Sequence, residues 1–383
     1  AQPIVITGAT VHTVTGGDLD DGWVLFESGR IVAVGRGEPP RAAGAEVISA
    51  AGLHVWPGLI STATTLGLIE TAMVTETRDE RELGQITPEV RAAVAINPDT
   101  DLIPVARANG ILTAMILPSG GLVAGRCSTI RLDGWTWEDM AIEPEAGLVV
   151  HWPRTEPEAR ILIGAGAEED EKKRRKEITE SLRQIDDVFD DAAAWLQARS
   201  ADSAQENDLR FEAMRPAIGG DAPVFIVAHS RGQIESAIAW ASRRGLKLVI
   251  VGGYDADLVI PALRANDVSV IISGIHRLPD RRDDPYDRPF RLPAVLYEAG
   301  IRFAIASGDA AAHERNLPYQ AATAVAYGLP KQAAIEAITI RAAEIIGLGA
   351  THGSIEPGKA ATLIVTTGDP LQITTDTVLA FID

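Results

Sequence analysis

Hydrophobic and polar positions follow one pattern at both ends of the chain and another in the middle. Short runs rich in Val, Ile and Thr fill the first fifty-odd residues, separated by turns at Gly16-Gly17 and Ser28-Gly29. The C-terminal part of the chain shows the same pattern, with β-rich runs at 361–366 and 377–382. We therefore expect the two ends to meet in one small β domain.

The middle of the chain alternates apolar runs with amphipathic stretches. Eight strands are expected, at 54–60, 111–117, 128–132, 147–152, 224–228, 246–251, 268–273 and 302–307. Helices are expected at 233–244, 256–266 and 330–346. Apolar strands joined by helices are typical of a (β/α)8 barrel, whose strands are buried on both faces. No Gly-x-Gly-x-x-Gly follows a strand, which disfavours an open doubly wound sheet. The predicted fold is α/β: a (β/α)8 TIM-like barrel plus a small β-sandwich formed from both termini.

Residues 168–199 do not follow this alternation of apolar strands and helices. A dense charge run is followed by Ile178, Leu182, Ile185 and Phe189 at three- and four-residue spacing, which predicts a long amphipathic helix. Two interpretations stay open. The segment is either a barrel helix lengthened by insertion, or a functional helix that acts as a lid or contacts a partner through complementary charges.

The composition of the chain disfavours or excludes several classes of function. With 35 Lys+Arg against 53 Asp+Glu, the net charge of −18 disfavours binding to nucleic acid or to an anionic membrane surface. No apolar stretch approaches 18 residues, so we expect no membrane insertion. The single Cys127 excludes an internal disulfide and a thiolate zinc site. The Ala1-Gln2 start resembles a cleaved signal-peptide site and predicts a periplasmic or secreted protein, with a cytoplasmic one as the alternative.

Three motifs carry a family resemblance. The segment at 57–67 begins Pro-Gly-Leu-Ile, and the segments at 337–348 and 353–365 hold Ala-Ile-Thr and Gly-Ser-Ile-Glu-Pro-Gly-Lys-Ala. Together they resemble the amidohydrolase superfamily, in particular its imidazolonepropionase- and prolidase-like branch. The resemblance implies a barrel at 57–352 and a composite β-sandwich domain built from 1–56 and 353–383.

The same resemblance implies metal-assisted hydrolysis of C–N bonds, in which one or two divalent ions activate a water molecule. The family places His-x-His on strand 1, one His each on strands 5 and 6, and a Lys or acid on strand 4. Here the four histidine positions fall on Ala63, Thr65, Val227 and Gly252, and strand 4 holds no Lys or Glu. Only the strand-8 aspartate has a counterpart, Asp309. One carboxylate cannot hold a catalytic zinc, so we expect a degenerate metal site and no cofactor.

Other polar residues are expected at the barrel mouth. His151, His229 and His276 follow strands 4, 5 and 7. Zinc is expected only if His151, His229 and Asp309 form a rebuilt site; otherwise these histidines line the rim as polar or hydrogen-bonding groups. Asp309 and His229 are the catalytic candidates, with Asp309 either a general base or a carboxylate that pairs with an arginine or caps a helix.

Arginines add candidates for binding an anionic ligand. Arg126 and Arg282 join His151 and His276 in this set, because guanidinium groups grip carboxylates bidentately. The loop after strand 7 balances four arginines against four aspartates, which favours pairing within the loop.

Three functions follow. The first is a pseudoenzyme that binds a ligand or supports a catalytically intact paralogue. The second is an active hydrolase of amide, cyclic amide or peptide-like bonds at a rebuilt or metal-free site around Asp309. The third is a structural assembly subunit. We expect a homo-oligomer, or a hetero-oligomer with a paralogous amidohydrolase.

Overall fold

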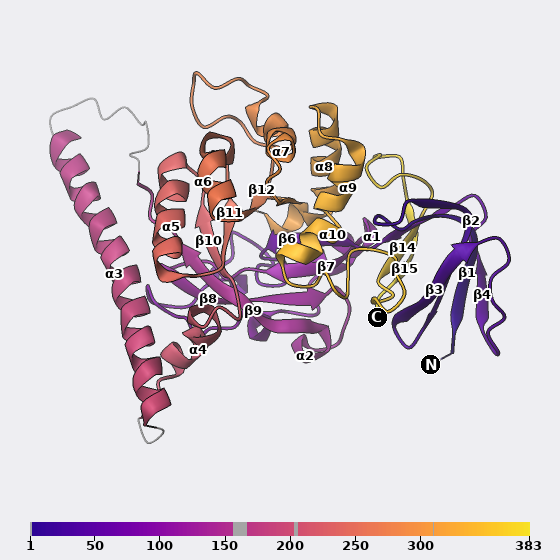
Figure 1. Cartoon of the computed structure of the whole chain (residues 1–383), viewed down its shortest axis with the longest axis horizontal. Helices are drawn as coiled ribbons and strands as arrows, with labels where there is room; N and C mark the ends of the chain where they lie inside the picture. Colours follow the sequence, from indigo (N-terminus) through magenta and orange to yellow (C-terminus); the bar gives the residue numbers. More distant parts are fainter. Residues whose placement is uncertain (1, 156–166, 203–205, 309) are drawn as a thin grey trace.

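A nearly closed eight-stranded sheet forms the centre of the molecule (Figure 1). The computed structural model describes residues 2–155, 167–202, 206–308 and 310–383. The strands run in the order β13-β12-β11-β10-β9-β8-β7-β6, and β13 contacts β6 to bring the edges together. Their bounds are β6 (Leu59–Thr64), β7 (Ile111–Ile116), β8 (Val123–Arg131), β9 (Ala141–His151), β10 (Val224–Ala228), β11 (Leu248–Gly252), β12 (Ser269–Ser273) and β13 (Phe303–Ala306). The protein is therefore an α/β barrel, as predicted.

Two details of the predicted barrel are wrong. The run at 54–60 is two strands, because β5 (His54–Pro57) joins the small sheet and β6 starts after Gly58. The side chain of Leu112 approaches Gly58 so closely that a Cβ there would lie 2.8 Å from Leu112 Cδ1. In addition, β8 is antiparallel to both β7 and β9, because the connection from β7 to β8 is too short for the crossover that parallel pairing requires.

Barrel side chains alternate between two cores. One core fills the lumen and includes Ile60, Met115, Val149, Phe225 and Ile271. The other lies between the strands and the helices, and includes Leu59, Ile116, Val150, Ile226 and Ile272. This two-sided burial explains why the strands read as continuous apolar runs.

Helices cover the outer face of the barrel. They are α1 (Leu102–Ala108), α2 (Trp137–Met140), α3 (Ala167–Ala201), α4 (Leu209–Ile218), α5 (Arg231–Arg244), α6 (Ile260–Ala265), α7 (Arg288–Glu298), α8 (Leu317–Ala326), α9 (Lys331–Ala337) and α10 (Ile340–Ile345). Short 3₁₀ turns are η1 (Thr75–Thr77), η2 (Ala92–Ala95), η3 (Ala256–Val259) and η4 (Ala311–Asn316). The helix expected at 330–346 is two helices, interrupted at Ile338 and Thr339, and the one expected at 256–266 is η3 followed by α6.

The long helix α3 stands at one side of the barrel (Figure 1). Its residues Ile185 and Phe189 are buried, and the Phe189 ring meets Trp240 of α5 edge-on at a centroid distance of 4.8 Å. Ile178 and Leu182, nearer its N-terminus, are only half-buried. The C-terminal half of α3 is therefore docked on the barrel and its N-terminal half is more exposed. No helix in the described part of the chain combines the length and apolar character needed to cross a membrane.

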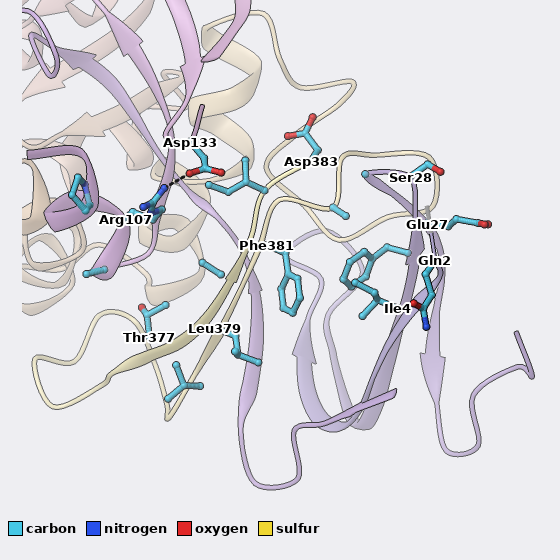
Figure 2. A pocket seen from close by; sticks show the side chains of 18 residues that line it. Gln2, Ile4, Glu27, Ser28, Arg107, Asp133, Thr377, Leu379, Phe381 and Asp383 are labelled. Atoms are coloured by element: carbon cyan, nitrogen blue, oxygen red, sulfur yellow. Dashed lines mark hydrogen bonds and ion pairs between the residues drawn. The ribbon is translucent and has the colours of Figure 1, made fainter. Parts of the chain in front are cut away.

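The β-rich unit is a seven-stranded mixed sheet that contains strands from both ends of the chain. Its strands are β1 (Ile4–His12), β2 (Asp18–Glu27), β3 (Arg30–Arg36), β4 (Glu46–Ser49), β5, β14 (Leu363–Thr366) and β15 (Thr377–Phe381). The order is β15-β14-β5-β1-β2-β3, with β4 paired to β1. A cleft of ≈ 710 Å³ lies between this sheet and α1, lined by Phe26, Phe381 and the Arg107–Asp133 ion pair (Figure 2). Arg107 precedes β7, so this cleft lies at the end of the barrel opposite the mouth.

Candidate functional site

Polar side chains gather where the parallel strands of the barrel end. His151 is the last residue of β9, and it lies opposite Val227 of β10 in the sheet register. Val227 packs against the core of the lumen, so His151 faces the lumen beside it. His229 follows β10 directly, and Tyr254 follows β11. These three residues form the floor of the mouth.

His229 is held by its neighbours but keeps one ring nitrogen free. Its backbone N–H donates to Gln233 Oε1 (3.2 Å), part of the capping interactions that start α5. Its ring stacks on Tyr254 with centroids 4.4 Å apart. The Nδ1 atom is buried and has no hydrogen-bond partner among the residues that the structure describes. Burial, reinforced by the positive charge of Arg154, lowers the pKa of His229 to about 4, so the imidazole is neutral at pH 7.

The ring of Tyr254 also contacts a cation, the guanidinium group of Arg277. The guanidinium of Arg277 lies 3.7 Å from the centroid of the Tyr254 ring, and its Nη1 atom donates to Asp280 (3.1 Å). A cation this close to an aromatic face is attracted by the ring quadrupole. His229, Tyr254 and Arg277 therefore form one stack, which we call the mouth stack.

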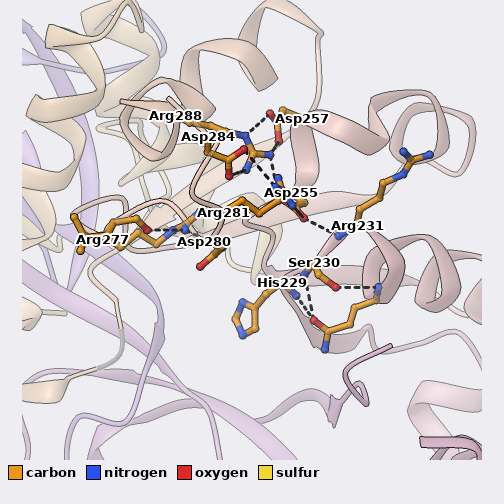
Figure 3. A network of polar contacts seen from close by, with 12 residues as sticks. His229, Ser230, Arg231, Asp255, Asp257, Arg277, Asp280, Arg281, Asp284 and Arg288 are labelled. Carbon is orange, nitrogen blue, oxygen red and sulfur yellow. Dashed lines mark hydrogen bonds and ion pairs between the residues drawn. The ribbon is translucent and has the colours of Figure 1, made fainter. Parts of the chain in front are cut away.

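An ion network fixes the loop that supplies Arg277 (Figure 3). Asp255 is buried and accepts two hydrogen bonds of 2.9 Å from Arg281 and one of 3.0 Å from the backbone N–H of Arg231. Burial opposes ionisation of Asp255, but the Arg281 and Arg231 donors outweigh it and hold its pKa below the usual value. Arg288 adds ion pairs to Asp255 (3.0 Å) and to neighbouring aspartates. The loop after β12 is thereby tied to the end of β11.

The residues at the family's metal positions do not fit a metal ion. Ala63 and Val227 offer no donor atom, and Thr65 is not a usual ligand. Gly252 has a φ of +103°, and a Cβ atom added there would clash with Nδ1 of His229. The ring of His229 thus takes the space that a strand-6 histidine needs. Within the described residues, no group of three or more His, Cys, Asp or Glu side chains could hold a metal.

The other predicted site residues are scattered. The Nε2 atom of His276 lies 2.7 Å from Thr323 Oγ1 of α8, so this histidine is engaged by a helix. Arg126 lies within β8, where it pairs with Glu145 (2.6 Å). Arg282 is exposed on the loop after β12, and Asp309 lies outside the described residues. Of the predicted residues that the structure describes, only His151 and His229 lie together, close enough for His151 to affect the pKa of His229.

Sequence reasoning missed two acidic residues near the mouth. Asp255 follows Gly252-Gly253-Tyr254 at the end of a strand, a position that could have marked it. Glu314 of η4 is fully buried, and neither carboxylate oxygen has a partner of good geometry in the described part of the chain. Burial raises the pKa of Glu314, although the hydroxyls of Ser61 and Ser307 favour its ionised form. No sequence signal marks Glu314, because its burial depends on how η4 packs on β6.

Comparisons with known proteins agree with this architecture. The model of the amidohydrolase family matches residues 288–381. An amidohydrolase, tasK, from Hapsidospora irregularis is 23% identical over 428 residues, which cover 100% of this chain and 43% of that protein. The chain therefore spans less than half the length of this curated relative.

Solved structures extend the likeness to the whole fold. An amidohydrolase from Thermotoga maritima MSB8 superposes with a TM-score of 0.86 at 25% identity, covering 99% of this chain and 98% of that one. A prolidase complexed with N-methylphosphonate-L-proline superposes with a TM-score of 0.57 at 16% identity, covering 97% and 94%. The second likeness concerns the fold alone.

Proposed function

Because this chain belongs to the amidohydrolase superfamily, we propose that it is a non-catalytic member that binds a small ligand at its barrel mouth. One observation carries the proposal. The position of the strand-6 ligand is a glycine, and the space beside it is filled by the ring of His229. A metal at the family's position would need donors that Ala63, Thr65, Val227 and Gly252 do not supply.

The mouth stack indicates what such a ligand carries. Because Nδ1 of His229 is buried against Gly252, a ligand would meet the neutral ring at Nε2, which donates a hydrogen bond if it carries the proton. The positive charge of Arg154 acts on the same place, since it lowers the pKa of His229, whereas Arg277 and its partner Asp280 act in opposite directions. A small polar molecule with a negatively charged acceptor group fits these groups. Stacking on Tyr254 would keep the His229 ring in place for it.

Elemental analysis of natively purified protein tests the proposal. The wild type is compared with Asp309→Ala and His229→Ala, since these two residues would belong to any rebuilt site. We expect no metal whose content depends on either residue. About one zinc, manganese or nickel ion per chain, lost in Asp309→Ala, would overturn the proposal.

A second candidate function is hydrolysis of C–N bonds by a metal-free site. The observation that favours it is the neutral ring of His229 at the barrel mouth, which can accept a proton at Nε2 in the tautomer with the proton on Nδ1; its pKa of about 4 makes it a weak base. A screen of dipeptides and cyclic amides would then detect turnover that His229→Ala lowers by about 10²–10⁴-fold, as expected for loss of a general base. The rate would fall on the acid side near pH 4. No turnover by the wild type, or turnover that His229→Ala leaves unchanged, contradicts this candidate.

We also propose that α3 contacts a partner chain, either a second copy or a paralogous amidohydrolase. Ile178 is half-buried in the N-terminal half of the helix, beyond Leu182, which packs against the barrel core. Multi-angle light scattering should show a mass above that of one chain, falling in Ile178→Glu, which leaves the docked residues of α3 unchanged. A monomer at micromolar concentration, with no co-purifying paralogue, contradicts this proposal.

A further inference from the structure

The long helix α3 carries a row of charged side chains along its solvent face. The positions 173, 176, 180, 183, 187 and 190 follow one another at alternating three- and four-residue spacing, as the contact positions of a coiled-coil helix do. We call this row the charged seam, and its six side chains are all exposed: Lys173, Lys176, Glu180, Arg183, Asp187 and Asp190. In Figure 1, α3 is the outermost element on its side of the barrel, so another chain can reach the charged seam.

The order of the charges makes the seam complementary to itself in one direction. Its N-terminal end is basic and its C-terminal end is acidic. An antiparallel second copy would bring opposite charges together at every position: Lys173 with Asp190, Lys176 with Asp187, and Glu180 with Arg183. All three pairs are centred on one point, between Ser181 and Leu182, as a two-fold axis requires. In a parallel alignment each side chain would instead face its own counterpart, and like charges would repel.

We propose that two copies of this chain associate through antiparallel pairing of their charged seams. This inference rests on the proposal that α3 contacts a partner chain, and it selects a second copy because the seam is complementary to itself. The seam lies on the side of α3 opposite Ile178, since Lys176 is two residues away and successive residues turn by about 100°. The contact through Ile178 and the contact through the seam can therefore fail separately.

Ion pairs within the chain order the seam without removing it from solvent. Arg183 pairs with both Glu180 and Asp187 on the same helix, and all three side chains remain about half exposed. Asp190 pairs with Arg244 of α5 at 2.6 Å, yet its side chain is 69% exposed. A carboxylate has about four lone-pair sites, so each of these acids can accept a further hydrogen bond from a lysine of the second copy.

Charge, rather than apolar burial, would hold the two helices together, because every position of the seam is charged. The net charge of −18 makes two copies repel one another at long range. In about 0.1 M salt the Debye length is about 10 Å, which weakens that repulsion but leaves charges in direct contact attracted. In about 1 M salt it falls to about 3 Å, so the seam pairs should weaken as well.

Sedimentation equilibrium of the full chain at micromolar concentration tests the pairing. We expect a dimer in about 0.1 M salt that dissociates in about 1 M salt. Lys176→Gln removes the same pair twice because of the two-fold axis, and should weaken dimerisation about 2–30-fold, the effect of losing two exposed ion pairs. The matched control is Lys247→Gln, at an exposed position just before β11, which should dimerise as the wild type does.

Charge reversal makes the test specific for the antiparallel arrangement. The first variant combines Lys173→Glu with Lys176→Glu, and the second combines Asp187→Lys with Asp191→Lys, since Asp191 lies beside the seam. Asp190 is left unchanged because it holds Arg244 of α5. Each variant alone should be monomeric, because like charges then face each other at both ends of the seam. A one-to-one mixture of the two should form a heterodimer. Circular dichroism confirms that both variants are folded.

Several outcomes would overturn the pairing. They are a monomeric wild type in about 0.1 M salt, a dimer that persists in both charge-reversed variants, or a mixture that stays monomeric. A dimer that only Ile178→Glu dissociates would show that α3 contacts its partner through the other side of the helix. A dimer that the charge-reversed variants dissociate and Ile178→Glu leaves intact would support the seam and contradict the contact through Ile178.

Discussion

Replacing Gly252 with alanine should force the ring of His229 out of its place at the barrel mouth. The added Cβ would lie well inside van der Waals contact with Nδ1 and Cε1 of His229, and 3.0 Å from the carbonyl oxygen of Ala228. Since atoms pack at about 3.5–4.0 Å, the ring must move by roughly 1 Å or more. That movement would also separate it from Tyr254.

Two separate costs set the size of the effect. A side chain at φ +103° is strained, which costs about 1–3 kcal/mol. Overpacking beside a held ring costs about 1–3 kcal/mol more. In the His229→Ala background most of the second cost disappears, because the imidazole atoms that Cβ meets are gone and only the Ala228 carbonyl oxygen at 3.0 Å remains. The two substitutions should therefore be coupled by about 1–3 kcal/mol.

Urea unfolding of the four proteins of this cycle, followed by tryptophan fluorescence, measures the coupling. We expect Gly252→Ala to lower the free energy of unfolding by about 2–6 kcal/mol in the wild type and by about half of that with His229→Ala. An equal loss in both backgrounds would refute the close approach of His229 to position 252. A loss under about 1 kcal/mol in the wild type would refute both costs.

Three further predictions concern stability. Burial raises the pKa of Glu314, so the folded state favours its neutral form. The stability of the wild type should therefore fall as the pH rises from about 4.3, the usual pKa of Glu, through the raised pKa of the folded state. Thermal unfolding at a series of pH values should show that Glu314→Gln removes this slope. Equal slopes in both proteins would contradict the burial of an ionisable carboxyl. Arg281→Met should lower the free energy of unfolding by about 3 kcal/mol, the low end for breaking a buried ion pair, because Asp255 keeps other donors. Arg282→Met, at an exposed position of the same loop, should lower it by less than about 0.5 kcal/mol. Similar urea midpoints for the two variants would count against the network. Phe189→Ala should cost about 3–5 kcal/mol by opening a cavity between α3 and α5, and a loss under about 1 kcal/mol would mean that α3 is not docked there.

The barrel could be predicted because its strands are buried on both faces and read as apolar runs. The direction of β8 could not, since an antiparallel strand in the wall is buried in the same way as its parallel neighbours. The sequence at 54–60 does not reveal that the chain passes there from the small sheet to the barrel, because β5 and β6 are both apolar and only Gly58 separates them.

The candidate site was predictable only in part. The substitutions at the family's metal positions are visible in the sequence, and so is the pairing of Arg277 with Asp280 within one loop. The ion pair between Asp255 and Arg281 joins two segments that no spacing rule connects. The filling of the space beside Gly252 by His229 depends on the positions of two neighbouring strand ends, which only the folded chain defines.

A crystal structure with anomalous diffraction at the zinc edge, from crystals soaked in zinc, tests the central claim most directly. The account predicts no anomalous peak in the barrel mouth. His229 should keep its stack on Tyr254, and density for a small organic molecule should lie against Nε2 of its ring when a ligand is retained. A peak about 2.0–2.1 Å from His229 or His151, with Asp309 as a further ligand, would contradict the account and show a rebuilt metal centre.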